Sequence, residues 1–263
     1  QPDNHPSWPG APREPPDQAA MGRTLHDLRL QIPPLSSIHS PNTPGLPPPE
    51  AAVNRIRADY LRLASLFSSK VVYFTMPGGT LSHSMSEFCP SLTLECGQAG
   101  DVHGTDHSMA FLEACLHLDD LPLTPVDADA VHLFHMVATV KVRDDVLFGF
   151  GNVPTDLAVR ENLDQFKLCE LPAGTALGDL RDGAQPPLLA VDTEGAEVTA
   201  QYFRFDRGEV RTNREVMPSM LTQDRRVIQQ DCLCYLMERI HFEDNEEVTG
   251  IDPLPEGISR SDT

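Results

Sequence analysis

The chain has 263 residues, a length that suits one large domain or two small ones. Its 39 acidic and 20 basic side chains give a formal net charge of -19 at pH 7, which argues against a nucleic-acid backbone or an anionic membrane surface as a partner. No run approaches the roughly 18 apolar residues of a membrane span. The six cysteines are scattered without a CxxC pair, which favours reduced core thiols in a cytoplasmic protein over a disulfide framework.

Proline marks the first 50 residues, which hold 13 of the 24 prolines. Proline cannot donate a backbone hydrogen bond and is excluded from helix interiors and central strands. Residues 1–50 are therefore predicted to be irregular. The chain opens at Gln1 rather than at Met, so we also expect that it is a fragment.

Residues 51–122 are predicted to form part of an α/β layered sheet. Apolar residues at three- and four-residue steps predict a helix with one buried stripe, made of Val53, Ile56, Tyr60, Leu63 and Phe67. Runs rich in β-branched or aromatic residues predict strands at 70–75 and 91–96. Thr105 is predicted to cap a second helix, whose apolar face carries Met109, Leu112, Cys115 and Leu116.

Residues 126–240 are predicted to form a small all-β domain. Short strand-like runs separated by turn signals cover 131–142, 146–150, 165–171, 188–191 and 197–205. The run 227–240 fits either a last strand or a helix. The acidic, polar tail at 241–263 is predicted to be disordered.

The densest concentration of chemical groups lies around Glu95, which ends the second predicted strand. A carboxylate at the end of an apolar strand is partly desolvated, which raises its pKa toward the range where it can carry protons. Gly78 and Gly79 allow close approach of a ligand to the backbone, and Thr80 and His83 follow them. The alternatives are an ordinary turn at the two glycines, a solvated charge at Glu95 and a surface or capping role for His83.

Candidate metal ligands are few. His103 and His107 have the i, i+4 spacing that grips a metal on a helix, but Gly104 between them favours a loop. His132 and His135 fall on opposite faces of a predicted strand, which argues against a shared metal. A His-x-x-Glu pair is absent from the sequence.

Two motifs together resemble the succinylglutamate desuccinylase/aspartoacylase family. They are Val71-Val-Tyr-Phe-Thr-Met-Pro-Gly-Gly-Thr-Leu-Ser-His83 and Leu92-Thr-Leu-Glu-Cys-Gly97, which match the family's Pro-Gly-Gly-Thr-x-(Ser/Thr)-His loop and its Thr-Leu-Glu-x-Gly strand. Weaker similarity, at 104–106, 161–166 and 171–177, extends the match over roughly residues 55–180. The resemblance implies a carboxypeptidase-like α/β layer, with 51–122 as the C-terminal half of a catalytic domain, followed by the small β domain.

The resemblance also implies an activity. Members of the family are zinc-dependent amide hydrolases that split N2-succinylglutamate into succinate and glutamate in arginine catabolism. The family's proton-carrying glutamate maps onto Glu95, and the substrate-lining loop maps onto Gly78, Gly79, Thr80 and His83. The implied partner is a small acyl amino acid, and the implied cofactor is zinc.

The metal ligands of the family do not map onto this chain. The best match to its ligand-bearing Asp-Leu-His strand begins at Asp27 and puts Arg29 at the ligand position, where a protonated guanidinium cannot coordinate zinc. His26 and His39 lie nearby but out of register. Three interpretations of residues 1–50 follow: a truncated copy, a shifted reading frame, or a non-catalytic relative that acts as a binding or scaffold module. A deacylase for another N-acyl amino acid is the remaining alternative.

Overall fold

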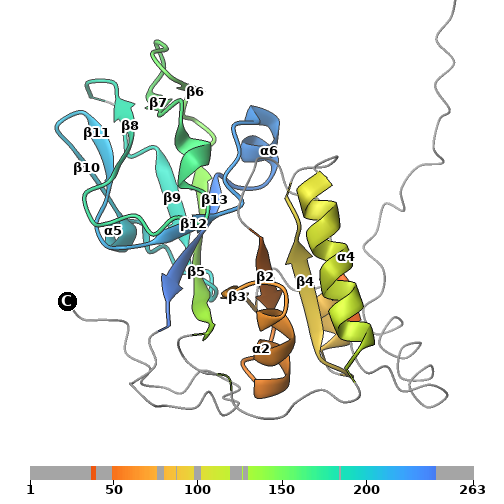
Figure 1. Cartoon of the computed structure of the whole chain (residues 1–263). Helices are drawn as coiled ribbons and strands as arrows, with labels where there is room; N and C mark the ends of the chain where they lie inside the picture. Colours follow the sequence, from red (N-terminus) through yellow and green to blue (C-terminus); the bar gives the residue numbers. More distant parts are fainter. Residues whose placement is uncertain are drawn as a thin grey trace, which may run out of the picture.

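The structure is a computed structural model that describes residues 37–39, 49–75, 80–86, 88–97, 102–118, 126, 130–183 and 185–240. Two sheets, with few helices, make up this part of the chain (Figure 1). The predicted α/β layer followed by a smaller β unit is thereby confirmed as the fold class. Residues 1–50 are not irregular throughout, because Ser37–His39 is a strand and Glu50 begins another. The rest of the predicted irregular segment, apart from Pro49, and the predicted disordered tail at 241–263 lie outside the described residues.

The larger sheet has eight strands in the order β1-β4-β2-β3-β5-β13-β12, and β9 also pairs with β5. Strands β2, β3 and β5 run parallel to one another, whereas β4 runs antiparallel to β2. The strands span Ser37–His39 (β1), Glu50–Val53 (β2), Lys70–Tyr73 (β3), Ser91–Glu95 (β4), His132–Val142 (β5), Leu188–Val191 (β9), Met217–Ser219 (β12) and Cys234–Arg239 (β13).

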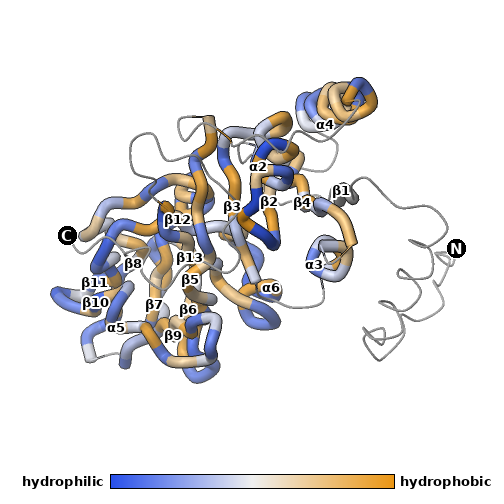
Figure 2. The backbone as a smooth tube through the Cα atoms, turned by 90° about the horizontal axis from the view of Figure 1, so that it is seen from below, coloured by the Kyte–Doolittle hydropathy of each residue, from blue (hydrophilic) through white to orange (hydrophobic). Residues whose placement is uncertain are grey.

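Helices cover both faces of the β4-β2-β3 part of this sheet. They are α2 (Ala58–Ser65), α3 (Leu81–Met85) and α4 (Val102–Leu116). Figure 2 shows α2 and α4 on one side of these strands and α3 on the other. The apolar side chains between α2, α4 and the sheet form one core cluster, which includes Tyr60, Leu63, Phe111 and Leu133. The polar residues discussed below lie on the α3 side.

The smaller sheet has five strands in the order β10-β11-β8-β7-β6. They span Phe148–Phe150 (β6), Leu157–Val159 (β7), Ala176–Leu180 (β8), Phe203–Asp206 (β10) and Glu209–Thr212 (β11). A second core cluster joins these strands to β5, β9 and β13 of the larger sheet. Strand β5 therefore contributes to the cores of both sheets, and the division of the chain at residues 122–126 stays a prediction.

Four of the predicted strands are confirmed within a residue or two at their ends. They correspond to β3, β4, β5 and β9. The run predicted at 146–150 contains the shorter β6. The run 227–240, which fitted either a strand or a helix, contains most of the helix α6 (Arg225–Gln230) followed by the strand β13.

Other predicted elements are wrong in part. The first helix begins at Ala58, because Val53 and Ile56 belong to β2 and to the turn after it, although their spacing imitates a helical stripe. The predicted strand at 165–171 is a short 3-10 helix, η2 (Leu163–Phe166), followed by a turn. The predicted strand at 197–205 begins instead with the short helix α5 (Thr199–Tyr202).

The second helix shows a different buried face from the predicted one. Helix α4 begins at Val102, three residues before the predicted cap at Thr105; Met109, Leu112 and Leu116 are exposed on it, and of the predicted apolar face only Cys115 packs against the core. The face that packs on the sheet carries Gly104, His107 and Phe111 instead, at three- and four-residue steps. No helix in the described part of the chain is long and apolar enough to cross a membrane.

Candidate active site

A row of four ionisable residues crosses the larger sheet at the ends of neighbouring strands. Glu95 is the last residue of β4 and pairs directly with Glu50, the first residue of β2. The parallel register of β2 and β3 puts Glu50 beside Lys70, and Lys70 pairs with His132 at the start of β5. Side chains at paired positions point to the same face of a sheet. The row therefore presents two carboxylates, an amine and an imidazole on one face.

The segment after η2 covers this face and keeps water from the carboxylates. Lys167 and Leu168 lie there, and Leu168 packs against apolar side chains of β2, β3 and β5 on the same face as the row. The Lys70 amine donates a hydrogen bond to the Leu168 carbonyl, with 98 residues between them in the chain. Glu50 is 3 % exposed, Glu95 8 % and Lys167 5 %. Three ionisable side chains are thus buried together.

Burial changes the proton affinity of Glu50. Loss of solvent, followed by repulsion from Glu95, raises the pKa of the Glu50 carboxyl to about 8, although Lys167 and Lys70 act in the opposite direction. Its Oε2 atom is buried and accepts no hydrogen bond from the described residues. Burial also lowers the pKa of Lys167, while attraction to Glu50 and Glu95 favours the charged ammonium. At neutral pH Glu50 is therefore mostly a neutral carboxylic acid.

Helix α3 lies on the same face as Glu95. Thr80 is its N-cap and accepts a hydrogen bond from the His83 backbone N–H at 3.3 Å. The Thr93 hydroxyl donates to the buried Ser82 Oγ at 2.9 Å. Thr93 and Glu95 are two residues apart in β4, so their side chains share a face. This hydrogen bond therefore anchors α3 close to Glu95.

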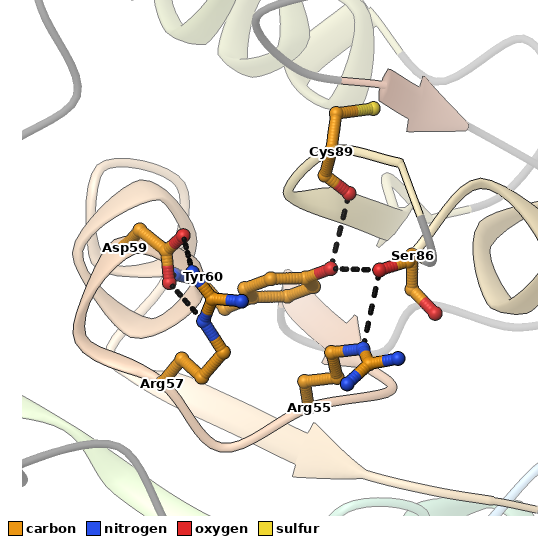
Figure 3. A network of polar contacts seen from close by, with 6 residues as sticks. All are labelled: Arg55, Arg57, Asp59, Tyr60, Ser86 and Cys89. Atoms are coloured by element: carbon orange, nitrogen blue, oxygen red, sulfur yellow. Dashed lines mark hydrogen bonds and ion pairs between the residues drawn. The ribbon is translucent and has the colours of Figure 1, made fainter. Parts of the chain in front are cut away.

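A second network fixes the chain directly after α3 (Figure 3). The buried Tyr60 hydroxyl lies 3.0 Å from the carbonyl oxygens of both Ser86 and Cys89 and shares its hydrogen between them. The Arg55 Nε donates to the Ser86 carbonyl at 3.1 Å. Burial raises the pKa of Tyr60 to about 12, so the hydroxyl keeps its proton. Helix α2 thereby holds the end of α3 against the sheet.

The residues predicted from the sequence are only partly visible in this arrangement. Glu95 is buried beside α3, and that helix is capped by Thr80, whereas the sequence had left open a capping role for His83. The Nδ1 atom of His83 is buried and has no hydrogen-bond partner among the described residues. Gly78 and Gly79 lie outside the described residues. The catalytic and substrate-binding roles of all five stay predictions.

Sequence analysis missed three members of the cluster: Glu50, Lys70 and Lys167. For Glu50, the local signal is that a charged residue begins the apolar run Glu50–Val53, which is typical of a strand end. Lys167 has no such signal, because only the packing of the segment after η2 on the larger sheet brings it to the carboxylates.

Metal ligands are not assembled in the described residues, which contain no group of three or more His, Cys, Asp or Glu side chains able to hold an ion. His103 and His107 do lie on a helix, against the prediction of a loop, but the His107 ring contacts the Phe67 carbonyl at 2.7 Å and stacks on the Phe67 ring. The buried carboxylates face lysine ammonium groups, which cannot ligate a cation. Zinc therefore does not fit the described part of this site, and the side chains of His26 and His39 lie outside it.

Comparison with known proteins gives similarity at the level of three-dimensional structure. No model of a known protein family matches the chain, and no curated protein matches it in sequence. The succinylglutamate desuccinylase of Chromobacterium violaceum is 14% identical with a TM-score of 0.48, over 86% of this chain and 61% of that one. A succinylglutamate desuccinylase/aspartoacylase of Rhodobacter sphaeroides is 16% identical with a TM-score of 0.48, over 89% of this chain and 67% of that one.

Murine aminoacylase 3 is also similar, with 11% identity and a TM-score of 0.44, over 92% of this chain and 75% of that one. The chain thus spans 61% of the length of the Chromobacterium violaceum structure and 67% of the Rhodobacter sphaeroides structure. The names of these two bacterial structures are those of the family whose two motifs the sequence resembles.

Proposed function

We propose that this chain is an amide hydrolase of acyl amino acids, with N2-succinylglutamate as substrate and Glu95 as the group that carries the proton. One observation supports this most directly: Glu95 is buried at the end of an apolar strand, on the face where Thr93 anchors the helix that follows the glycine-rich segment. A carboxylate that is shielded from solvent is suited to general acid–base catalysis, because burial moves its pKa toward the range in which it can carry a proton.

The reaction needs a group that takes a proton from water and later returns it to the leaving amine. A water molecule adds to the acyl carbonyl carbon while Glu95 takes one of its protons. The carbon–nitrogen bond then breaks, and Glu95 returns the proton to the leaving amine, so that the products are succinate and glutamate. Lys167 contributes positive charge near Glu95, which favours the ionised carboxylate that must accept the proton.

Zinc remains part of the proposal only through the family resemblance. Bound zinc lowers the pKa of water and polarises a carbonyl group in hydrolases of this kind. The described residues do not offer the ligands for it, as shown above. Any zinc site in this protein must therefore draw on residues outside the described part of the chain.

An activity assay tests the proposal. The full chain is assayed on N2-succinylglutamate with and without added zinc, alongside the variant Glu95→Gln. The matched control is Glu194→Gln, which makes the same substitution at an exposed turn of the second half of the chain. We expect turnover by the wild type and by the control and its loss in Glu95→Gln. Equal turnover by all three proteins would exclude Glu95 as the proton carrier.

The alternative function is a non-catalytic binding or scaffold module. The absence of a metal-binding group from the described residues favours it. Metal analysis of the purified full chain distinguishes the two functions, since stoichiometric tight zinc supports the hydrolase. A panel of N-acyl amino acids then separates a desuccinylase from a deacylase with another acyl preference.

A further inference from the structure

Glu50 and Glu95 form a pair of buried carboxyl groups, and the proposed reaction gives a role to Glu95 alone. They are direct cross-strand partners in β2 and β4. The Cβ atoms of such partners are about 4.5–5.5 Å apart, so the two carboxyl groups are held close together by the sheet itself. Both are largely removed from solvent. Two negative charges at this separation in a dry environment repel each other strongly.

The two carboxyl groups differ in how deeply they are buried. Lys167 faces the pair from the segment after η2, and Lys70 faces Glu50 from β3, where its amine is already engaged with the Leu168 carbonyl. Glu50 is the more deeply buried, with 3 % of its surface exposed against 8 % for Glu95. Burial is costly for a carboxylate but much less costly for a neutral acid, so Glu50 is the better holder of a proton.

We propose that the two carboxyl groups hold one proton between them at neutral pH, that Glu50 carries it, and that Glu50 is thereby a positioning residue that keeps Glu95 ionised beside Lys167. The arrangement leaves the pair with a single negative charge next to the buried ammonium of Lys167. The positioning role rests on the proposed function, whereas the shared proton does not. Above the pH at which Glu50 ionises, both carboxyl groups are charged, repel each other and compete for Lys167, so Glu95 is no longer held beside Lys167 and turnover is expected to fall.

Titration of the glutamate side chains tests the shared proton without any assay of activity. The full chain is labelled with ¹³C at the glutamate carboxyl carbons and followed by NMR from acidic to alkaline pH. In the wild type we expect one carboxyl group to titrate near pH 8. The signal is assigned by its loss in Glu50→Gln, and Glu194→Gln, exposed in a turn, leaves it unchanged.

Two further variants move this titration in opposite directions. Glu95→Gln removes the repulsion, so the midpoint of Glu50 falls by about one pH unit or more. Lys167→Met removes the attraction, so the midpoint rises; this second variant decides the matter if Glu95→Gln does not fold. A Glu50 midpoint below neutral pH in the wild type, or one that neither variant moves, would overturn the proposal.

The pH dependence of turnover then tests the positioning role. Gln cannot ionise, so we expect the fall of kcat/KM near pH 8 to disappear in Glu50→Gln, whereas the exposed control Glu194→Gln keeps the wild-type pH profile. An unchanged alkaline fall in Glu50→Gln would exclude Glu50 from this role. Absence of turnover in every variant would refute the proposed function, and the titration would still decide whether the proton is shared.

Discussion

Replacement of Glu50 by Gln gives the sharpest test of the energetics of the buried pair. The pKa of the Glu50 carboxyl rises from 4.5 to about 8 on folding. The folded protein therefore binds the proton more tightly than the unfolded chain, and the free energy of unfolding falls as pH rises through the window between these two values. With about 1.4 kcal/mol for each pH unit, the wild type loses roughly 3–4 kcal/mol between about pH 5 and about pH 8 from this group alone. Gln cannot ionise, so Glu50→Gln lacks this loss.

Urea unfolding followed by circular dichroism at a series of pH values measures the effect. The quantity of interest is the difference in the free energy of unfolding between Glu50→Gln and the wild type, because the contributions of other groups cancel in it. We expect this difference to grow in favour of the variant by roughly 3 kcal/mol across the window, whereas Glu194→Gln stays parallel to the wild type. Parallel curves for Glu50→Gln and the wild type would refute the assignment of a raised pKa to Glu50.

Three other substitutions test the packing around the site by the same unfolding measurement. Gly104→Ala adds a Cβ 2.0 Å from the Cys96 carbonyl oxygen, so α4 must move, and we expect the free energy of unfolding to fall by about 2 kcal/mol or more despite the better helix propensity of Ala. The control Ala110→Gly, on the exposed face of α4, should lower it by only about 1 kcal/mol. An unchanged stability of Gly104→Ala would contradict the contact. Tyr60→Phe removes the donor to two buried carbonyl groups and should cost about 1–2 kcal/mol, independently of pH in the neutral range; no loss would show that water replaces the hydroxyl. Lys167→Met leaves the carboxyl pair without its buried cation and should cost about 3 kcal/mol or more at alkaline pH and less at acidic pH; an equal cost at both would argue against the charge interaction.

The sequence indicated the strands with the clearest β-branched and aromatic composition, such as Lys70–Tyr73 and His132–Val142, because this composition is a property of the segment itself. It failed at Glu50–Val53, where Val53 and Ile56 continue the spacing of α2 backward by coincidence. The two pairing partners that make this segment a strand, β3 and β4, lie further along the chain and cannot be read from the segment itself.

The candidate site shows the same limit. Glu95 was identified because its neighbours in the sequence form a motif, and its burial required only the apolar strand before it. Lys167 was missed because it reaches the carboxylates through the packing of Leu168 on the larger sheet. Local patterns predict which side chain ends a strand, whereas the charges that surround it depend on contacts between distant segments.

The segment after η2, which covers the carboxyl pair, has a thermodynamic consequence of its own. Lys167 and Leu168 come from the segment that leads into β8 of the smaller sheet, and the Lys70 hydrogen bond ties that segment down. If the segment lifts, water reaches Glu50 and the acid dissociates. Lifting is thus accompanied by release of a proton to bulk solvent, and alkalinity favours it to the same degree that acidity opposes it. Access to the interior of this molecule is therefore coupled to the hydrogen-ion activity of its surroundings.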